Sequence, residues 1–294
     1  MEIHSSKNER GAALVVALTI SAIVSLLLAM AIVSIQRQGE EVRLIRAAVL
    51  AQNKVESVES ELIYVLSTTR AWMDGIVENE QSDQAKKLNF HGQPFDWSGA
   101  MVSITDVQGY ISLYPFDKDA FGQLLVALDV DDHRREIIID SIQDWQDPDD
   151  FTHIFGAERQ DYSVDNYPTN QPFKTKKELC NVQGMDADLC DKILPYLVLH
   201  GSDTLILQKA PKSLLTLLLG EERTDLIVSK READLSSGIL LGSNVNPETY
   251  NPYPSDKLKI TIEYETRGVI AKRHLMLTRA KSTVFGVLVS YEDN

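Results

Sequence analysis

The chain has 294 residues, of which 44% are hydrophobic, so it is long enough for one or two domains with a sizeable core. Its 43 acidic residues outnumber 29 basic ones, and a net charge of −14 argues against a general nucleic-acid binder, because phosphate binding requires a basic surface. The sequence contains no HExxH, GxSxG, P-loop or CxxC motif, so hydrolytic or redox catalysis finds little support and no enzyme is predicted.

An apolar segment follows a short polar stub at the N-terminus. Residues 11–36 carry no charged side chain and are long enough to span the roughly 30 Å hydrocarbon core of a bilayer as a helix. The run continues into Gln36 and Arg37 without a small-residue cleavage site, which is not the pattern of a removable secretory signal. The sequence therefore predicts a membrane anchor over residues 12–36, whose orientation the nearby basic residues barely decide.

Helical periodicity continues beyond the apolar run, and no proline occurs before Pro94. We expect one helix from Ala12 to about Arg70, roughly 90 Å long at about 1.5 Å per residue. Residues 37–70 form its amphipathic part. The residues expected on the apolar face of that part are Val42, Ile45, Val49, Val55, Val58, Leu62 and Val65.

The junction RG-AALVV, in which a short basic leader ends in glycine, resembles that of type IV pilins and pseudopilins. The resemblance implies that a prepilin peptidase cleaves between Gly11 and Ala12 and removes a leader of residues 1–11. Most members carry a glutamate at the fifth mature position, where this chain has Val16. The large minor pseudopilins of type II secretion, family K, normally lack that glutamate. A buried carboxylate needs a paired amine from a neighbouring subunit, so its absence fits a subunit at the filament tip.

The middle of the chain resembles the same family K more specifically. A predicted helical segment from Lys118 to Trp145 ends in DSIQDWQDPDD, which is followed by FGAERQDYSVDNYPTNQP and KKELCNVQGM. The chain departs from the family at Arg159 and Gln160, where further acidic residues are usual, and at LILQKAP, where the family has an Asn-rich stretch. The residues that match the family in order and spacing are Asp144, Trp145, Asp147, Asp149, Asp150, Gly156, Ala157, Glu158, Tyr162, Tyr167, Asn170, Pro172, Glu178, Leu179, Val182 and Gly184.

Acidic residues are concentrated in a loop between about residues 144 and 165. Calcium takes six to eight oxygen ligands from flexible loops, so the residue type suits this ion, although the spacing is not that of an EF-hand. The family resemblance also implies calcium in this region, against the alternative of a solvated acidic loop. His153, beside the loop, is interpreted as a solvated side chain. The predicted calcium ligands are drawn from Asp147, Asp149, Asp150, Glu158 and Asp161.

Two cysteines, Cys180 and Cys190, flank the turn NVQGMDADL of a predicted helical hairpin. In an oxidising compartment they could form a disulfide across the two helices, which we predict. Separate buried thiols are the alternative, since other apolar residues could take the facing positions. A DNA-binding use of the hairpin is disfavoured by the aspartates at its turn and second helix.

The end of the chain predicts β-structure. Alternation over residues 258–264, a turn at Arg267 and Gly268, and further segments to Tyr291 indicate three strands, and MVSITDVQGYISL predicts an earlier hairpin around residues 106–109. Together these elements predict an α+β, pilin-like fold, in which a long N-terminal transmembrane helix packs on an antiparallel sheet. Residues 71–116 and 246–294 would form the α/β head, and residues 117–245 a helical insertion with the acidic loop.

The resemblance implies a non-enzymatic minor pseudopilin at the tip of the type II secretion pseudopilus. It would help initiate assembly and export of folded periplasmic proteins. Implied partners are other minor pseudopilins, the prepilin peptidase, the inner-membrane assembly platform, and exoproteins or the outer-membrane secretin, with no nucleic acid. The anchor would lie in the inner membrane with a cytoplasmic N-terminus and a periplasmic body. The alternatives are a minor pilin of a type IV pilus and a signal-anchored periplasmic enzyme.

Overall fold

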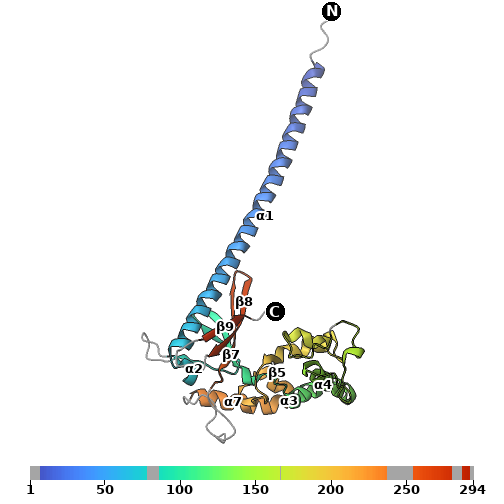
Figure 1. The fold of residues 1–294 in the computed structure, drawn as a ribbon. Helices are drawn as coiled ribbons and strands as arrows, with labels where there is room; N and C mark the ends of the chain where they lie inside the picture. Colours follow the sequence, from blue (N-terminus) through green and yellow to red (C-terminus); the bar gives the residue numbers. More distant parts are fainter. Residues whose placement is uncertain (1–6, 78–85, 166, 237–253, 280–286, 292–294) are drawn as a thin grey trace, which may run out of the picture.

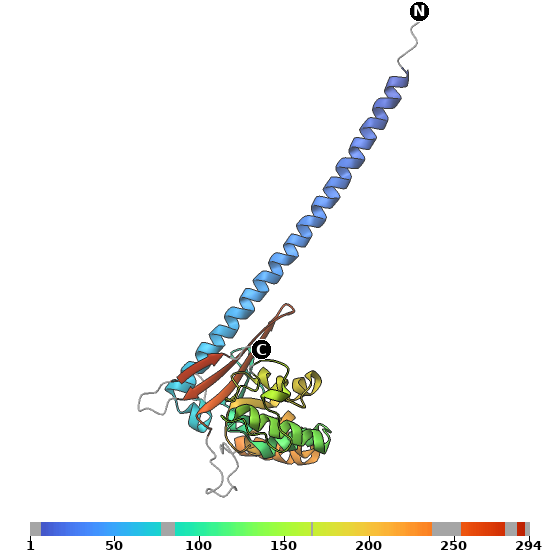
Figure 2. The same ribbon diagram turned by 45° about the vertical axis from the view of Figure 1, so that its right-hand side comes forward.

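The structure is a computed structural model that describes residues 7–77, 86–165, 167–236, 254–279 and 287–291. Its first element is one continuous helix, α1 (Lys7–Thr68), which leaves the body as a free rod (Figures 1 and 2). The helix begins before the expected position, Ala12, because the preceding residues Lys7 to Arg10 include no helix breaker. Within the described residues, α1 is the one helix long and apolar enough to cross a membrane.

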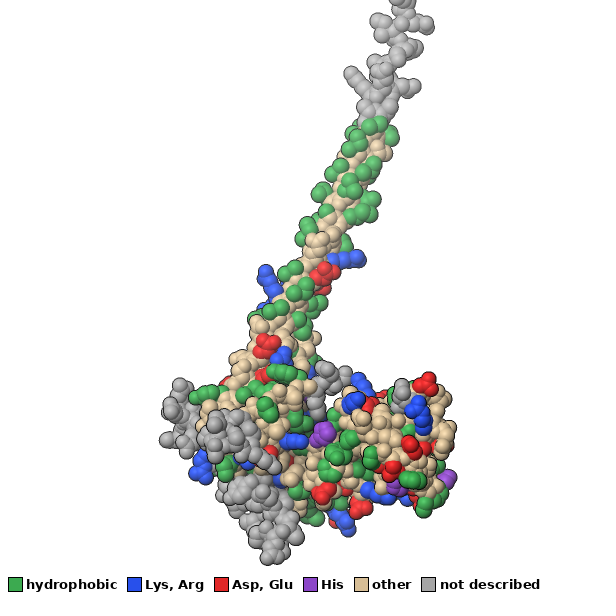
Figure 3. All heavy atoms as spheres, in the orientation of Figure 1, with side chains coloured by type: hydrophobic (Ala, Val, Ile, Leu, Met, Phe, Trp, Pro, Cys, Tyr) green, Lys and Arg blue, Asp and Glu red, His purple; other side chains and the backbone are tan. Residues whose placement is uncertain are grey.

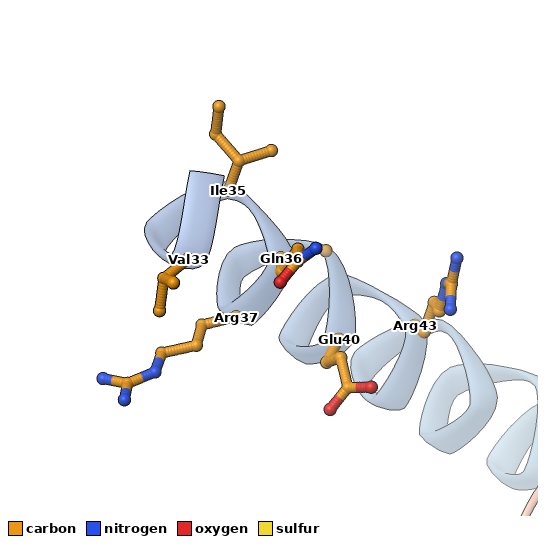
Figure 4. Close-up of a pocket in the computed structure, with 7 residues that line it drawn as sticks. Val33, Ile35, Gln36, Arg37, Glu40 and Arg43 are labelled. Carbon is orange, nitrogen blue, oxygen red and sulfur yellow. The ribbon is translucent and has the colours of Figure 1, made fainter. Parts of the chain in front are cut away.

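From Leu14 to Ile35, α1 exposes its large apolar side chains, and apolar side chains follow this part of the helix on the face seen in Figure 3. No other described part of the chain covers them. Every residue from Leu14 to Arg46 is exposed. After Arg10 the next charged residue is Arg37, and Figure 4 shows side chains of this boundary, such as Arg37 and Arg43, pointing outward in different directions from a single helix. The shallow hollow between them has no opposing wall, so it is not a binding site.

The second half of α1 packs on the sheet through one stripe of residues. The predicted apolar face is wrong in its first part, because Val42, Ile45 and Val49 are exposed and small alanines occupy the buried positions instead. On the polar side, Glu59 accepts a hydrogen bond from Arg273 of the sheet at 2.8 Å. The buried stripe consists of Ala47, Ala51, Val55, Val58, Leu62 and Leu66, at the three- and four-residue steps of a helix face.

The head contains a five-stranded antiparallel sheet in the order β3-β4-β7-β8-β9. Its strands are β3 (Phe95–Trp97), β4 (Ala100–Asp106), β7 (Lys257–Thr266), β8 (Val269–Arg279) and β9 (Val287–Tyr291). The predicted turn between β7 and β8 is confirmed, with positive φ at Arg267 and Gly268. A short helix α2 (Ala71–Asp74) and the paired strands β1 (Ile76–Val77) and β2 (Lys86–Lys87) complete the head.

The predicted hairpin around residues 106–109 is wrong. After β4 the chain forms a 3₁₀ turn, η1 (Val107–Gly109), and then β5 (Ile111–Tyr114), which pairs in parallel with β6 (Leu197–His200) in a separate sheet. Asp106 ends β4 by accepting a hydrogen bond from the Gln108 N–H. Gly109 then passes directly against the backbone of Lys209, where a Cβ atom would overlap the carbonyl group. The chain thereby leaves the head for a second, inserted lobe.

The inserted lobe (residues 111–236) lies on the side of the sheet away from α1 (Figures 1 and 2). The segment predicted as one helical stretch is divided, since Asp129 adopts a positive φ and Asp131 caps the next helix. The lobe has its own hydrophobic core, separate from that of the head. Besides β5 and β6, its elements are α3 (Lys118–Ala127), α4 (Asp132–Gln146), η2 (Arg159–Asp161), η3 (Lys176–Asn181), α5 (Ala187–Ile193), η4 (Leu194–Tyr196), η5 (Leu207–Lys209), α6 (Lys212–Leu219) and α7 (Glu221–Ser236).

A buried ion pair joins the lobe to the head. Lys209 of η5 lies 2.8 Å from Asp106 at the end of β4, and both side chains are essentially inaccessible to solvent. Asp106 also accepts hydrogen bonds from the Ser255 N–H and hydroxyl, at 2.6 and 2.7 Å, just before β7. The end of β4, η5 of the lobe and the segment before β7 therefore meet at one carboxylate. The predicted fold class, a long helix on an antiparallel sheet with a helical region between strands, is confirmed.

Candidate metal centre

The acidic loop begins at the C-terminal end of α4. Asp144 lies in the last turn of the helix and is fully buried, and Asp147 is its C-cap residue. Together with His153 from the following loop, they present ligand atoms that all lie within 4.8 Å of one another. A helix C-terminus carries a partial negative charge, so two carboxylates there are unfavourable unless a cation compensates them.

His153 is not the solvated side chain that the sequence suggested. Its Nδ1 atom contacts the Asp144 carboxylate, and its backbone N–H donates to the same group at 3.1 Å. The side-chain hydrogen bond between the ring and Asp144 raises the pKa of His153. The loop is therefore folded back onto the end of α4.

Glu158 brings a third carboxylate close enough for the charges of Asp144 and Asp147 to act on it. Its side chain is 2% exposed, and neither oxygen has a hydrogen-bond partner among the described residues, as is also true of one oxygen of Asp147. Burial, with the nearby charges of Asp144 and Asp147, raises the pKa of Glu158 to about 7. Burial and the charge of Asp149 raise the pKa of Asp147 as well. Buried oxygens without a protein partner, in a group of carboxylates, fit a bound cation.

The other three predicted ligands, Asp149, Asp150 and Asp161, accept hydrogen bonds that stabilise the loop. Asp149 accepts a hydrogen bond from the Phe151 N–H at 2.9 Å, and Asp150 accepts one from Asn170 at 3.2 Å. Asp161 accepts the Glu158 N–H at 3.0 Å and so stabilises the η2 turn. All three side chains are exposed. They shape the loop around the centre, whereas Asp144, absent from the predicted ligands, lies inside it.

Gly156 makes the approach of the loop to the helix possible. A Cβ atom at this position would overlap the Asp144 carboxylate. In the GAE sequence, Gly156 therefore leaves room for the buried carboxylate of Asp144. Two residues later, Glu158 provides a second buried carboxylate. Calcium prefers such carboxylate and carbonyl oxygens, and Asp144, Asp147 and Glu158 have the donor atoms to hold it.

Aromatic residues support the same end of α4. Trp145 is fully buried and stacks on Phe173 with ring centroids 5.7 Å apart. Tyr162 and Tyr167 approach the same indole at 5.6 and 4.8 Å. The Tyr162 hydroxyl accepts a hydrogen bond from the Gln183 N–H, and burial raises its pKa to about 12. The core of the lobe thus fixes the position of the adjacent Asp144.

The structure also places the two remaining pairs of predicted site residues. Cys180 of η3 and Cys190 of α5 form a disulfide, with Cα atoms 5.5 Å apart. The first arm of the predicted helical hairpin is a 3₁₀ helix, which turns Cys180 toward α5. Gly11 and Ala12 lie within α1, and the structure describes only their backbone.

Comparison with known proteins bears on this lobe. Residues 102–201 match the family described as type II secretion system (T2SS), protein K. The match includes the candidate metal centre, the disulfide and both strands of the small parallel sheet.

Two protein K relatives match a similar part of the chain. The protein from Dickeya chrysanthemi is 37% identical over 91 residues, which are 31% of this chain and 25% of the relative. That from Pectobacterium carotovorum subsp. carotovorum is 34% identical over 85 residues, or 28% of this chain and 26% of the relative. The match therefore spans about a quarter of each relative's length. A solved GspK-GspI-GspJ complex from enterotoxigenic Escherichia coli is 17% identical over 88% of this chain and 99% of that chain, with a TM-score of 0.49.

Proposed function

We propose that the chain is a minor pseudopilin of the type II secretion system. The observation that carries this proposal is the protein K match in the inserted lobe of a chain that begins with a membrane-length helix continuous with a sheet head. The match also favours type II secretion over a type IV pilus. An exposed apolar half-helix needs a bilayer or other helices around it. In this proposal the membrane surrounds it before assembly, and the packed helices of the filament core surround it afterwards.

In this proposal the subunit lies at the pseudopilus tip. The lobe adds a second hydrophobic core beside the head, and this bulk suits a position above which no further subunit stacks. Val16 stands where most pilins have a glutamate, so the subunit lacks the carboxylate that pairs with the amine of a subunit above it. Its partners would be other minor pseudopilins, as in the GspK-GspI-GspJ complex, and the inner-membrane platform. It would help start assembly and export of folded periplasmic proteins through the secretin.

The proposed topology has a direct test. The N-terminus would be cytoplasmic, the body periplasmic, and prepilin peptidase would cut between Gly11 and Ala12 of the membrane-inserted precursor. We expect mass spectrometry of the membrane-extracted protein to show a chain beginning at Ala12. The variant G11L should retain the leader, whereas G39L, a matched change at an exposed helix position with no neighbours, should be processed normally. A chain that still begins at Met1 in cells with active peptidase would contradict the proposal.

We also propose that the candidate metal centre binds calcium, with Asp144, Asp147 and Glu158 as ligands. When bound, the ion would neutralise carboxylates that otherwise repel one another at the end of α4. At a calcium concentration about 100 times Kd, stability should rise by about 2.7 kcal/mol, because the ion binds only the folded loop. Thermal unfolding of the full chain in detergent, with and without calcium, measures this shift.

Two variants separate the calcium site from general charge effects. E158Q removes a buried ligand and should abolish most of the calcium-dependent rise in melting temperature. D188N removes one exposed carboxylate of the same lobe, outside the centre, and should leave that rise unchanged. An equal response of the two variants would mean that calcium acts only on the surface charge.

A further inference from the structure

A cleft of about 460 Å³ lies between the sheet head and the inserted lobe. Lys174 and Lys176 line it from the segment that begins η3, and His200 lines it from the end of β6. Lys257, the first residue of β7, lines it from the head. We call this site the basic cleft. Its volume is within the range of ordinary ligand sites.

The sheet presents its outer face to the basic cleft. Leu275 and Leu277 of β8 are buried against α1, so the alternate residues Met276 and Thr278 point to the opposite face, where they line the cleft. Thr278 pairs with Lys257 of the neighbouring strand. The floor of the cleft is therefore a strand surface with apolar and hydroxyl side chains beside a lysine.

The charge of the basic cleft is opposite to that of the whole chain. The chain has 43 acidic residues against 29 basic ones, yet three lysines and a histidine line the cleft and its described lining has no acidic side chain. Two carboxylates close in sequence to the lining make other contacts. Glu178 accepts the backbone N–H groups of Lys174 and Thr175, and Asp256, next to Lys257, pairs with Arg279 at 3.2 Å. Basic side chains from three separate elements thus face one cavity.

The shape of the cleft favours an extended ligand over a compact anion. The basic residues come from η3, β6 and β7, with Leu199 and Met276 also in the lining, so they are not arranged around one phosphate-sized point. Ser290 of β9 adds a hydroxyl donor at the edge of the sheet. β9 is the last strand in the sheet order among the described residues, which leaves an edge where an extended backbone can lie.

We infer that the basic cleft binds an extended acidic peptide segment of a partner protein. Carboxylates of the segment meet Lys174, Lys176 and Lys257, and an apolar side chain between them rests on Met276. The recognition uses residues of both the head and the lobe, so the segment holds the two parts in one arrangement. This inference does not depend on the chain being a pseudopilin.

Fluorescence anisotropy of the full chain in an uncharged detergent tests the inference. The probe is a fluorescein-labelled octapeptide of alternating Asp and Val, and the matched probe has Asn in place of Asp. We expect saturable binding of the acidic probe alone. The variant K174Q/K176Q/K257Q should weaken it at least about tenfold, because each exposed ion pair contributes up to about fivefold.

A control variant removes the same charge from elsewhere on the lobe. Lys118, Lys192 and Lys212 are exposed, with side chains 54%, 56% and 64% accessible, and lie outside the cleft lining. K118Q/K192Q/K212Q should change the affinity less than about twofold, since only screened long-range attraction is lost. Replacing the three cleft lysines by arginine should retain binding, which distinguishes loss of charge from misfolding.

Three results would overturn the inference. Equal weakening by the two glutamine variants would show attraction without a site. Displacement of the probe by inorganic phosphate, at constant ionic strength, would indicate a small-anion site. The third result is probe binding that appears only in the variant E292Q/D293N, which removes the two acidic residues that follow Tyr291. It would show that the cleft binds acidic residues of this chain and not a segment of a partner protein.

Discussion

Replacement of Lys209 by methionine tests whether the buried ion pair holds the lobe on the head. The methionine retains most of the side-chain volume but removes the charge. The change also deprives Gln108 of a donor, since Lys209 Nζ donates to its Oε1 atom at 2.6 Å. Asp106 would remain buried with its hydrogen bonds to Ser255 but without a cation.

The expected cost follows from the distance and the burial. Two unit charges at 2.8 Å attract by about 6 kcal/mol at an effective dielectric constant of about 20. Removing one partner of a buried pair typically costs about 3–5 kcal/mol, because the other charge stays desolvated. We therefore expect K209M to lower the free energy of unfolding by about 3–5 kcal/mol. The double variant D106N/K209M should be about 2 kcal/mol more stable than the sum of the single changes predicts.

Guanidinium unfolding of the full chain in detergent, followed by tryptophan fluorescence, measures these values. Trp72 and Trp97 report on the core of the head, and Trp145 on that of the lobe. If the pair joins the two cores, single-tryptophan variants should unfold together in the parent chain and at separate denaturant concentrations in K209M. A cost below about 1 kcal/mol, or additive single changes, would refute this account.

Three further predictions concern single positions. G156A should destabilise the lobe by about 1–3 kcal/mol and weaken calcium binding in calorimetry, because its methyl group overlaps a buried carboxylate, whereas G122A meets only an ordinary contact and should do neither. C180S/C190S should lose about 2.7 kcal/mol in non-reducing denaturant unfolding, for a separation of 10 residues, and reductant should then have no further effect. Burial and the charge of Arg231 lower the pKa of His91 to about 3, so the folded chain keeps this imidazole neutral, whereas the unfolded chain gains a proton there below about pH 6.5. The contribution of His91 to stability should therefore fall by about 2 kcal/mol between about pH 6.5 and pH 5. A pH series of thermal unfolding measures this fall as the difference between the parent chain and H91Q, in which the opposite contribution of Glu158, whose pKa is raised, cancels.

The elements with strong local periodicity were predictable from the sequence. The apolar run, the helix that continues from it and the alternation in β7 all depend on residues close in the chain. The hairpin at residues 106–109 failed because its pattern of alternating residues is equally compatible with a parallel strand. The true partner of Ile111 is Leu197, and no local signal identifies a partner so distant in sequence.

The candidate metal centre was predictable in place but not in detail. The density of acidic residues located the loop, yet it could not show which carboxylates face inward. Asp144 reads as part of a helix, and only its last-turn position next to Trp145 brings it into the core. Asp149 and Asp161 look equivalent to Glu158 in sequence, but their oxygens accept backbone hydrogen bonds of the loop itself. This competition between local turns and a shared site is settled by tertiary packing.

The unbroken α1 has a mechanical consequence. With 62 residues it is about 93 Å long, and no proline or second element divides its apolar half from the half fixed to the sheet. The helix therefore acts as a lever. A change in its tilt of about 10°, of the size that bilayer thickness imposes on a spanning helix, would displace the far end by about 16 Å. Small motions of the apolar half would thus become large movements of the body, whose direction the attachment of the helix to the sheet determines.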